Sequence, residues 1–294
     1  MSRLFEVVLA SGSDARSFLQ GQLTQDVNGL GDNPSLLSAW CNAKGRVIAV
    51  MRLVDSGAGN EVIGLAVPAA MAGQVIERLL RFRFRATVNL EPANGTWAAC
   101  AVADERDLAA LQELDLLPSG SGRMAVRGHG LVAVDTGAAP RCIEVYGPLT
   151  AMQEARLTFR RPLSDPEWQL ALIRAGIPVI YATTAERYTP HMLNLDCLGA
   201  ISFSKGCYTG QEVVARTEHL GKSKRRLMRF KTETAAARPG DKLRHEERDV
   251  GEVVNASHDQ LLGVVPLELA GATLLVNDHP ASPVALPYPL PAAT

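Results

Sequence analysis

The sequence of 294 residues has few of the features that mark membrane, secreted or metal-binding proteins. No apolar run approaches the length of a membrane helix. The N-terminal stretch has an acidic residue, Glu6, and lacks the apolar core of a signal peptide. The five cysteines, which form no Cys-x-x-Cys pair, are at positions 41, 100, 142, 197 and 207. This odd, scattered set argues against a disulfide framework or a cysteine-rich zinc site and fits a reducing compartment. We therefore expect a cytoplasmic protein with no membrane partner.

The chain also lacks a strong net charge and the common catalytic motifs. Its formal charge is -1, so nothing global demands nucleic acid or a membrane surface. It has no Gly-x-x-x-x-Gly-Lys-Ser/Thr phosphate loop and no His-Glu-x-x-His, and its six histidines are scattered, so spacing predicts no metal site. With 47% hydrophobic and 21% charged residues, the composition is that of a globular protein long enough for two or three cores.

Strands and helices are mixed along the chain without regular β-α-β alternation. Apolar runs and alternation predict strands, and spacings of three and four predict helices. We expect strands at 4–9, 35–40, 47–54, 61–67, 97–102, 131–134 and 142–146, and helices from 13, over 69–80, over 107–117 and from 165. Residues 118–122, Pro-Ser-Gly-Ser-Gly, read as a surface linker between two portions. The fold class predicted from this order is α+β.

One segment, Arg81 to Leu90, alternates basic and apolar residues. Phenylalanine, alanine, valine and leucine alternate with arginine, threonine and asparagine, as in a strand with one buried face. Arginines interleaved with aromatic residues also suit RNA binding. We favour the first interpretation, in which Phe82 and Phe84 face the core and the arginines face water.

The C-terminal part differs from the rest because it shows only short β segments broken by glycine. Segments at 250–254, 261–266, 273–276 and 284–286 predict a small β-barrel. We expect the domain boundary between 1–222 and 223–294. The run Lys222 to Lys231 has six basic residues in ten. It is either a solvated connector or a docking surface for phosphate or another anionic group.

The most informative stretch is Ile201 to Arg216. It reads as a short strand, a tight turn and a helix that begins at Gln211, with Cys207 between Lys205 and that helix. A lysine and a helix N-terminus both place positive charge near the sulfur and favour thiolate over thiol. The alternative is that Cys207 is a small buried hydrophobe without reactivity.

This stretch contains Lys-Gly-Cys-Tyr-Thr-Gly-Gln-Glu, from Lys205 to Glu212, which resembles the signature of the YgfZ family of folate-binding proteins. That family is similar to the aminomethyltransferase, or T-protein, of the glycine cleavage system. Weaker matches in the same order are Phe18 to Asp26, Lys44-Gly45-Arg46, and Pro190-His-Met-Leu-Asn-Leu-Asp196. The resemblance extends to about residue 230.

The resemblance implies a ring of two α+β portions around a central folate channel, closed by a C-terminal barrel. It implies tetrahydrofolate, or a derivative, as the cofactor, with the pterin deep inside and the glutamate tail toward solvent. Flat walls, a few polar groups and positive charge are what such a ligand needs. Motif position gives these candidates for binding it: Trp40, Lys44, Arg46, Arg174, Asn194, Asp196, Tyr208, Gln211 and Glu212. The same resemblance makes Cys207 and Lys205 the candidate reactive pair.

The sequence departs from T-protein at the positions of an acidic pair. Ala49 and Val50 stand where those acids belong, and Met192 stands where a glutamate would hold the pterin. Without a nearby base, aminomethyl transfer loses a contribution of roughly 10² to 10⁴-fold, so we do not expect this activity. The resemblance implies a role in the assembly or repair of iron–sulfur proteins and, through them, in transfer RNA modification. A folate-dependent one-carbon transferase and a folate-sensing scaffold without thiol chemistry remain as alternatives. With the resemblance, the anionic group at the run 222–231 would be the folate polyglutamate tail, and direct contact of this run with transfer RNA is a weaker possibility.

Overall fold

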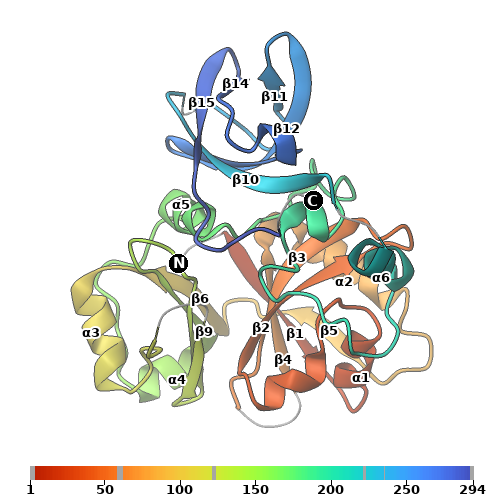
Figure 1. Ribbon diagram of the computed structural model, residues 1–294. Helices are drawn as coiled ribbons and strands as arrows, with labels where there is room; N and C mark the ends of the chain where they lie inside the picture. Colours follow the sequence, from red (N-terminus) through yellow and green to blue (C-terminus); the bar gives the residue numbers. More distant parts are fainter. Residues whose placement is uncertain (1–3, 58–61, 121–123, 221–222, 235, 292–294) are drawn as a thin grey trace.

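The computed structural model describes residues 4–57, 62–120, 124–220, 223–234 and 236–291. Two lobes, each built on its own antiparallel sheet, lie side by side, and a closed barrel sits across both of them (Figure 1). The chain fills the first lobe, then the second, returns to the first through a long irregular segment, and ends in the barrel. The architecture confirms the predicted α+β class with a C-terminal β-barrel.

The first lobe is a five-stranded sheet in the order β2-β3-β4-β1-β5. Its strands are β1 (Phe5–Ser11), β2 (Ser35–Cys41), β3 (Val47–Val54), β4 (Ile63–Pro68) and β5 (Asn89–Pro92). All eight residues of β3 are buried because both faces of the sheet are covered. One face packs against α1 (Ala15–Gln20) and α2 (Ala72–Leu80), and the other contributes to the centre of the molecule. The short 3₁₀ helices η1 (Val27–Gly31) and η2 (Ala69–Met71) complete this lobe.

The expected strand from residue 82 was wrong, because α2 is followed by a series of turns. The amides of Phe82 and Arg83 donate to the carbonyls of Leu79 and Leu80, and Ala86 donates to Arg83. Phe84 has a φ of 43°, which no strand accommodates. Strand β5 therefore begins only at Asn89. Phe82 and Phe84 are exposed rather than buried, which overturns the interpretation that placed them in the core.

The second lobe is a four-stranded sheet in the order β6-β9-β8-β7. Its strands are β6 (Trp97–Val102), β7 (Ala125–Gly128), β8 (Leu131–Asp135) and β9 (Ile143–Pro148), with α3 (Glu105–Glu113) and α4 (Leu149–Glu154) against one face. Residues 118–120 follow α3 and precede β7, and both elements belong to the second lobe, so the predicted linker position falls within one lobe instead of between two. Residues 121–123 lie outside the described part of the chain.

Helix α5 (Asp165–Ala175) leads from the second lobe to the barrel and the return segment (Figure 1). Ser164 and Glu167 form a capping box at its start, and Gly176 ends it in a left-handed conformation, with a φ of 68°. Residues 177–210 then contain one short 3₁₀ helix, η3 (His191–Leu193), before α6 (Gln211–Leu220). Residues 201–204 form no strand, contrary to prediction. Within the described part of the chain, a single backbone bond, from the Ser202 amide to the Thr24 carbonyl, ties them to a neighbouring segment.

The barrel closes six strands in the order β10-β13-β12-β11-β14-β15. These are β10 (Arg225–Thr232), β11 (Lys242–His245), β12 (Arg248–Ser257), β13 (Gln260–Pro266), β14 (Leu274–Val276) and β15 (His279–Val284), with η4 (Leu267–Leu269) between β13 and β14. Phe230 and Leu261 are among the side chains that fill it. The barrel is fastened to the return segment by buried Asn255, whose amide side chain exchanges bonds of 2.9 and 2.7 Å with the backbone of Val179.

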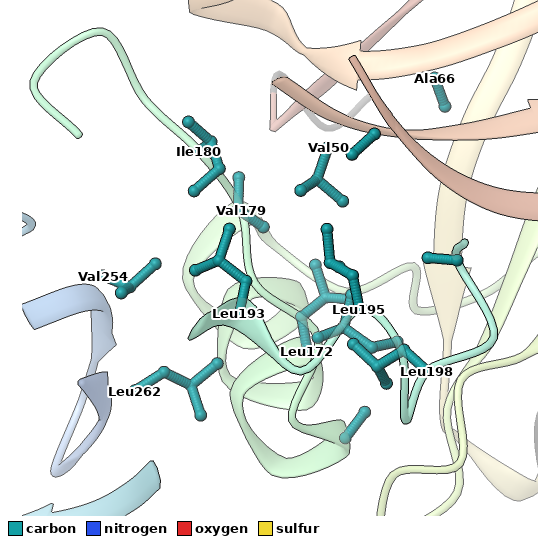
Figure 2. Packing of buried hydrophobic residues seen from close by; sticks show 14 of the residues in the cluster. Val50, Ala66, Leu172, Val179, Ile180, Leu193, Leu195, Leu198, Val254 and Leu262 are labelled. Atoms are coloured by element: carbon teal, nitrogen blue, oxygen red, sulfur yellow. The ribbon is translucent and has the colours of Figure 1, made fainter. Parts of the chain in front are cut away.

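Apolar side chains from both lobes, the return segment and the barrel meet at the centre of the molecule (Figure 2). Figure 2 shows Val50 of the first sheet, Leu172 of α5, Val179, Leu193 and Leu195 of the return segment, and Leu262 of the barrel around the same space. This shared core fixes the lobes and the barrel relative to one another. Among the described helices, none is both long and apolar enough to cross a membrane.

Candidate functional site

The two sequence motifs richest in glycine and charge meet in space. The turn between β2 and β3, from Asn42 to Arg46, packs against the start of α6. A methyl group at Gly210, whose φ is 80°, would lie 2.4 Å from the Asn42 carbonyl oxygen. One at Gly45, whose φ is 66°, would lie 2.8 Å from Val213 Cβ. Glycine is therefore required on both sides of this contact, which brings Lys44 and Arg46 close to the Cys207 motif.

Lys205 holds the Cys207 loop onto the turn that follows α1. Its Nζ donates to the carbonyls of Gln20, Leu23 and Gln25 at 2.7, 2.8 and 2.9 Å. The side chain is 8% exposed, and Nζ lies 5.3 Å from the centre of the Tyr208 ring. Burial lowers the pKa of the Lys205 ammonium to about 8, although the Asp26 carboxylate opposes the shift. All three N–H bonds are thus engaged by carbonyls, so Lys205 positions the loop; its proposed effect on the thiol stays a prediction.

Cys207 differs from the other four cysteines because its side chain is exposed. Burial raises the pKa of the Cys41 and Cys100 thiols to about 12 and that of Cys142 further still. Partial burial, with the neighbouring Asp196 carboxylate, raises the pKa of the Cys197 thiol to about 11. A thiolate is the reactive form of cysteine, and the raised pKa values disfavour it at these four positions. Cys207 is the cysteine whose side chain is exposed to solvent.

A cavity of about 380 Å³ lies where the hairpin, the return segment and the barrel meet. Four cationic and two acidic side chains line it, together with three apolar or aromatic residues and a glycine: Arg46, Arg187, Arg225, Lys242, Asp249, Glu252, Tyr188, Met192, Val264 and Gly251. The excess of positive charge suits an anionic ligand. Of the predicted binding residues, Arg46 lines this cavity, and its Nη1 donates to the Arg187 carbonyl at 2.8 Å.

Glu252 of the barrel organises the polar wall of this cavity. Its Oε1 accepts bonds of 2.7 Å from both Arg187 and Tyr188, and its Oε2 accepts one of 2.9 Å from Lys242. Burial opposes ionisation of this carboxyl, but the bonds from Lys242, Tyr188 and Arg187 outweigh it and lower the pKa of Glu252. The Glu252 carboxylate therefore holds Arg187 of the return segment and Lys242 of the barrel together at this cavity.

Two further cavities follow β3 away from this opening. A space of about 20 Å³ is bordered by Val50, Met51 and Arg52, and one of about 190 Å³ is bordered by Arg52, Leu37 and Leu198. The cavity beside Val50 is small because the apolar side chains shown in Figure 2 fill the centre of the molecule. Ala49 and Val50, which stand at the expected positions of the acidic pair, are both buried and apolar, so this stretch of β3 has no carboxylate. Packed apolar side chains thus separate the cavity at the hairpin end from the smaller cavity beyond Arg52.

Asn194 and Asp196 join the return segment to the barrel. Asn194 donates to the carbonyl of Leu227 at 2.8 Å, and Arg226 Nη1 contacts the two oxygens of Asp196 at 2.7 and 2.8 Å. Asp196 also lies near His191 and Glu218, with ligand atoms of all three within 4.8 Å of one another. His191 Nε2 and Glu218 Oε2 are 3.0 Å apart, and Arg226 forms an ion pair with Asp196. A hydrogen bond and an ion pair therefore link η3, α6 and β10 here.

The remaining predicted binding residues are not brought to the cavity. Trp40 is 1% exposed in the core of the first lobe, and Tyr208 is buried below Lys205. Arg174 lies at the end of α5, where its carbonyl accepts a bond from Arg229 of the barrel. Gln211 and Glu212 begin α6, with Glu212 exposed beside the hairpin contact.

The basic run at 222–231 is largely engaged within the protein. Arg225, Arg226 and Arg229 donate to the carbonyls of Val250, His191 and Arg174, and Lys231 pairs with Asp259. Lys222 lies outside the described residues. Arg226 and Arg229 therefore fasten the barrel to the return segment and to α5, whereas Arg225 and Lys231 are engaged within the barrel itself.

Sequence reasoning missed Arg187, Tyr188, Lys242 and Glu252 as cavity residues. The first two directly precede the Thr189-Pro190-His191 stretch, so their place beside a recognised motif was the available signal. Lys242 and Glu252 come from the barrel, and only its docking places them there.

Comparison with known proteins places these features in a family. Residues 224–288 match the family model described as CAF17, C-terminal beta-barrel domain. The tRNA-modifying protein YgfZ of Colwellia psychrerythraea is 31% identical over 223 residues, which cover 76% of this chain and 68% of the relative. The protein of the same name from Escherichia coli strain SE11 is 34% identical over 74% of this chain and 66% of its own length. The chain thus spans about two thirds of these relatives.

The structure also resembles a solved T-protein. The glycine cleavage system aminomethyltransferase T from Bartonella henselae superposes with a TM-score of 0.68 over 97% of this chain and 84% of the other. With 17% sequence identity, this likeness shows the fold alone. The identity to the Colwellia and Escherichia proteins over most of the chain goes further, and it shows that this chain belongs to the YgfZ family.

Proposed function

We propose that this protein binds tetrahydrofolate or a derivative and acts in the assembly or repair of iron–sulfur proteins. Through those proteins it would affect transfer RNA modification, with Cys207 as the working thiol. The observation that carries the proposal is that the hairpin which contributes Arg46 to the cationic cavity packs against the start of α6, the helix that follows the exposed Cys207. The relatives bear the name tRNA-modifying protein, which supports the last step.

The cavity residues fit a folate in size and charge. A volume of about 380 Å³ is within the range of small-molecule sites. Arg46, Arg187 and Lys242 would hold the carboxylates of the glutamate tail, because charge-assisted bonds to carboxylate are the strong ones available there. Tyr188, Met192 and Val264 would supply the less polar walls for the ring system. Bound folate would supply one-carbon chemistry.

The buried Ala49 and Val50 support a role other than aminomethyl transfer. No carboxylate lies on this stretch of β3, and the Glu144 carboxylate near the middle cavity is bound to Arg52 at 2.7 Å. A general base near the reacting nitrogen is what this transfer would need. A folate-dependent one-carbon transferase that uses Cys207, and a folate-sensing scaffold, are the competing functions.

A pair of cysteine variants tests the proposal. Tetrahydrofolate is titrated calorimetrically into the wild type, Cys207→Ala and Cys197→Ala, and each variant is scored for rescue of a strain with defective iron–sulfur enzymes. We expect folate binding in all three proteins and loss of rescue only for Cys207→Ala, because burial and the Asp196 carboxylate disfavour the reactive thiolate form of Cys197. Full rescue by Cys207→Ala would favour the scaffold. A folate-dependent turnover that Cys207→Ala loses would favour the transferase.

A further inference from the structure

The loop after α2, residues 81–85, presents aromatic and basic side chains to solvent. Its sequence is Arg-Phe-Arg-Phe-Arg, and all five residues are exposed. Phe82 is 39% exposed and Phe84 is 88% exposed. A single exposed apolar side chain is ordinary, but two large ones gathered in one short loop are typical of a surface that binds a partner.

The loop carries positive charge that the protein does not neutralise. From Arg78 to Leu90 the sequence has four arginines and no acidic residue. Arg78 is bound to Glu186 at 2.8 Å, and Arg81 forms an exposed pair with Glu77, four residues earlier, which is a weak interaction. Within the described part of the chain, no ion pair involves Arg83 or Arg85. Two guanidinium groups are therefore available for an external anion.

The two rings are held in different ways. Phe82 meets Trp40 edge-on, with ring centres 6.4 Å apart and planes at 84°, and this contact anchors the loop to the first lobe. Phe84 extends into solvent from a backbone with a φ of 43°. A left-handed conformation costs a bulky residue about 1–2 kcal/mol. Because the Phe84 ring is exposed, no burial of apolar surface offsets this cost. The loop thus holds the face of Phe84 outward at a cost to stability.

We propose that residues 81–85 form a binding site for single-stranded RNA. Guanidinium groups contact phosphates, and an exposed ring offers a stacking face that every base fits. Alternation of the two within five residues matches the alternation of phosphate and base along a strand. An acidic protein would use the arginines but has no need of the ring face, and an anionic membrane needs a larger apolar area than two rings.

The neighbouring hairpin tip extends this surface. Glu186 bonds to both Arg78 of α2 and Asn42 of the hairpin, at 2.8 and 2.6 Å, so the helix that carries the loop is tied to the tip. Lys44 is exposed at that tip. The proposal goes beyond the proposed function, in which transfer RNA is reached only through iron–sulfur enzymes. It requires neither folate nor Cys207.

The test measures binding of a fluorescein-labelled, unstructured 15-nucleotide RNA to the full chain by anisotropy. We expect Phe84→Ala to weaken binding roughly 5- to 100-fold, and Phe84→Tyr to restore it, because the ring is the stacking platform. The double variant Arg83→Ala/Arg85→Ala should weaken binding and make the slope of log affinity against log salt less negative by about 1.4, at about 0.7 per phosphate contact.

Matched controls come from the second lobe and from the thiol. Arg106→Ala/Arg160→Ala removes two exposed arginines, and Met124→Ala removes an exposed apolar side chain, so both should bind RNA as the wild type does. Cys207→Ala should also bind normally. Equal RNA affinity in all loop variants would overturn the proposal. So would absent RNA binding together with loop-dependent binding of polyglutamate or of vesicles containing phosphatidylglycerol.

Discussion

Lys205 donates its three N–H bonds to three carbonyls of a single turn, and this explains its place in the motif without reference to the thiol. An ammonium group is compact and can be surrounded by three acceptors, whereas a guanidinium is planar and directs its donors outward in a fork. The residue two positions before Cys207 therefore determines where the loop lies. Because its charge also remains close to the loop, an effect of Lys205 on the thiol stays a prediction beside this positioning role.

Replacing Lys205 tests this positioning role. We expect Lys205→Met to lower the free energy of unfolding by about 2–4 kcal/mol, because it leaves three carbonyls without their donor. Lys205→Arg should fail to restore the loss. Urea unfolding measures both, and hydrogen exchange should show faster exchange at residues 199–209. Lys44→Met, at the exposed hairpin tip, serves as the control with unchanged stability. Wild-type stability in Lys205→Met would show that the carbonyl bonds contribute nothing net.

At the scale of elements, the β2–β3 hairpin and α6 form one unit because two glycines allow their backbones to touch. Gly45 and Gly210 each have positive φ, and a methyl group at either one would lie within 3 Å of an atom from the other element. A methyl group at Gly206, in the same motif as Gly210, would meet no atom within 4 Å. The motif therefore contains one glycine that the packing requires and one that it tolerates losing.

These two glycines of the motif give a matched pair of variants. Gly210→Ala should destabilise the protein by about 2 kcal/mol or more, because alanine would be strained at that φ and would clash with the Asn42 carbonyl. Gly206→Ala should leave stability within about 0.5 kcal/mol of the wild type. Thermal unfolding of the two variants side by side checks this. Equal effects at both positions would argue that the hairpin and α6 are not in contact.

The sequence predicted elements well where local pattern decides the structure. The hairpin strands, α5 with its proline and glycine boundaries, and the barrel segments are each determined by their own residues. It failed at 82–88 and 201–204, where alternation suggested strands but no strand among the described residues pairs with these segments. It also missed Arg187 and Glu252, and placed Trp40 at the ligand, because long-range docking decides which side chains line a cavity.

At the scale of the whole molecule, a buried ion pair joins the two lobes. Arg52 of β3 and Glu144 of β9 meet at 2.7 Å, and Glu144 also accepts a 3.0 Å bond from Trp168 of α5. Burial disfavours the charge on Arg52, but the Glu144 carboxylate outweighs it and raises the pKa of the guanidinium. Three elements from different parts of the chain therefore depend on one carboxylate.

Removing one partner should cost more than removing both. We expect Glu144→Leu to destabilise the protein by about 3–5 kcal/mol, since it leaves a buried guanidinium unpaired. Arg52→Leu/Glu144→Leu should recover much of this loss because no buried charge remains. Urea unfolding of the two single variants and the double variant completes the thermodynamic cycle. Additive losses would contradict a direct interaction between the lobes at this pair.

The most direct test of the central claim is calorimetric titration of tetrahydrofolate into the wild type, Arg46→Ala, Lys242→Ala and Arg106→Ala. Arg46 comes from the hairpin and Lys242 from the barrel, and both line the cavity, whereas Arg106 is exposed on α3. A folate in this cavity predicts that the first two variants each weaken binding about tenfold or more and that the third binds as the wild type does. No binding to the wild type, or equal affinity in all four proteins, would contradict the proposal that this cavity is the folate site.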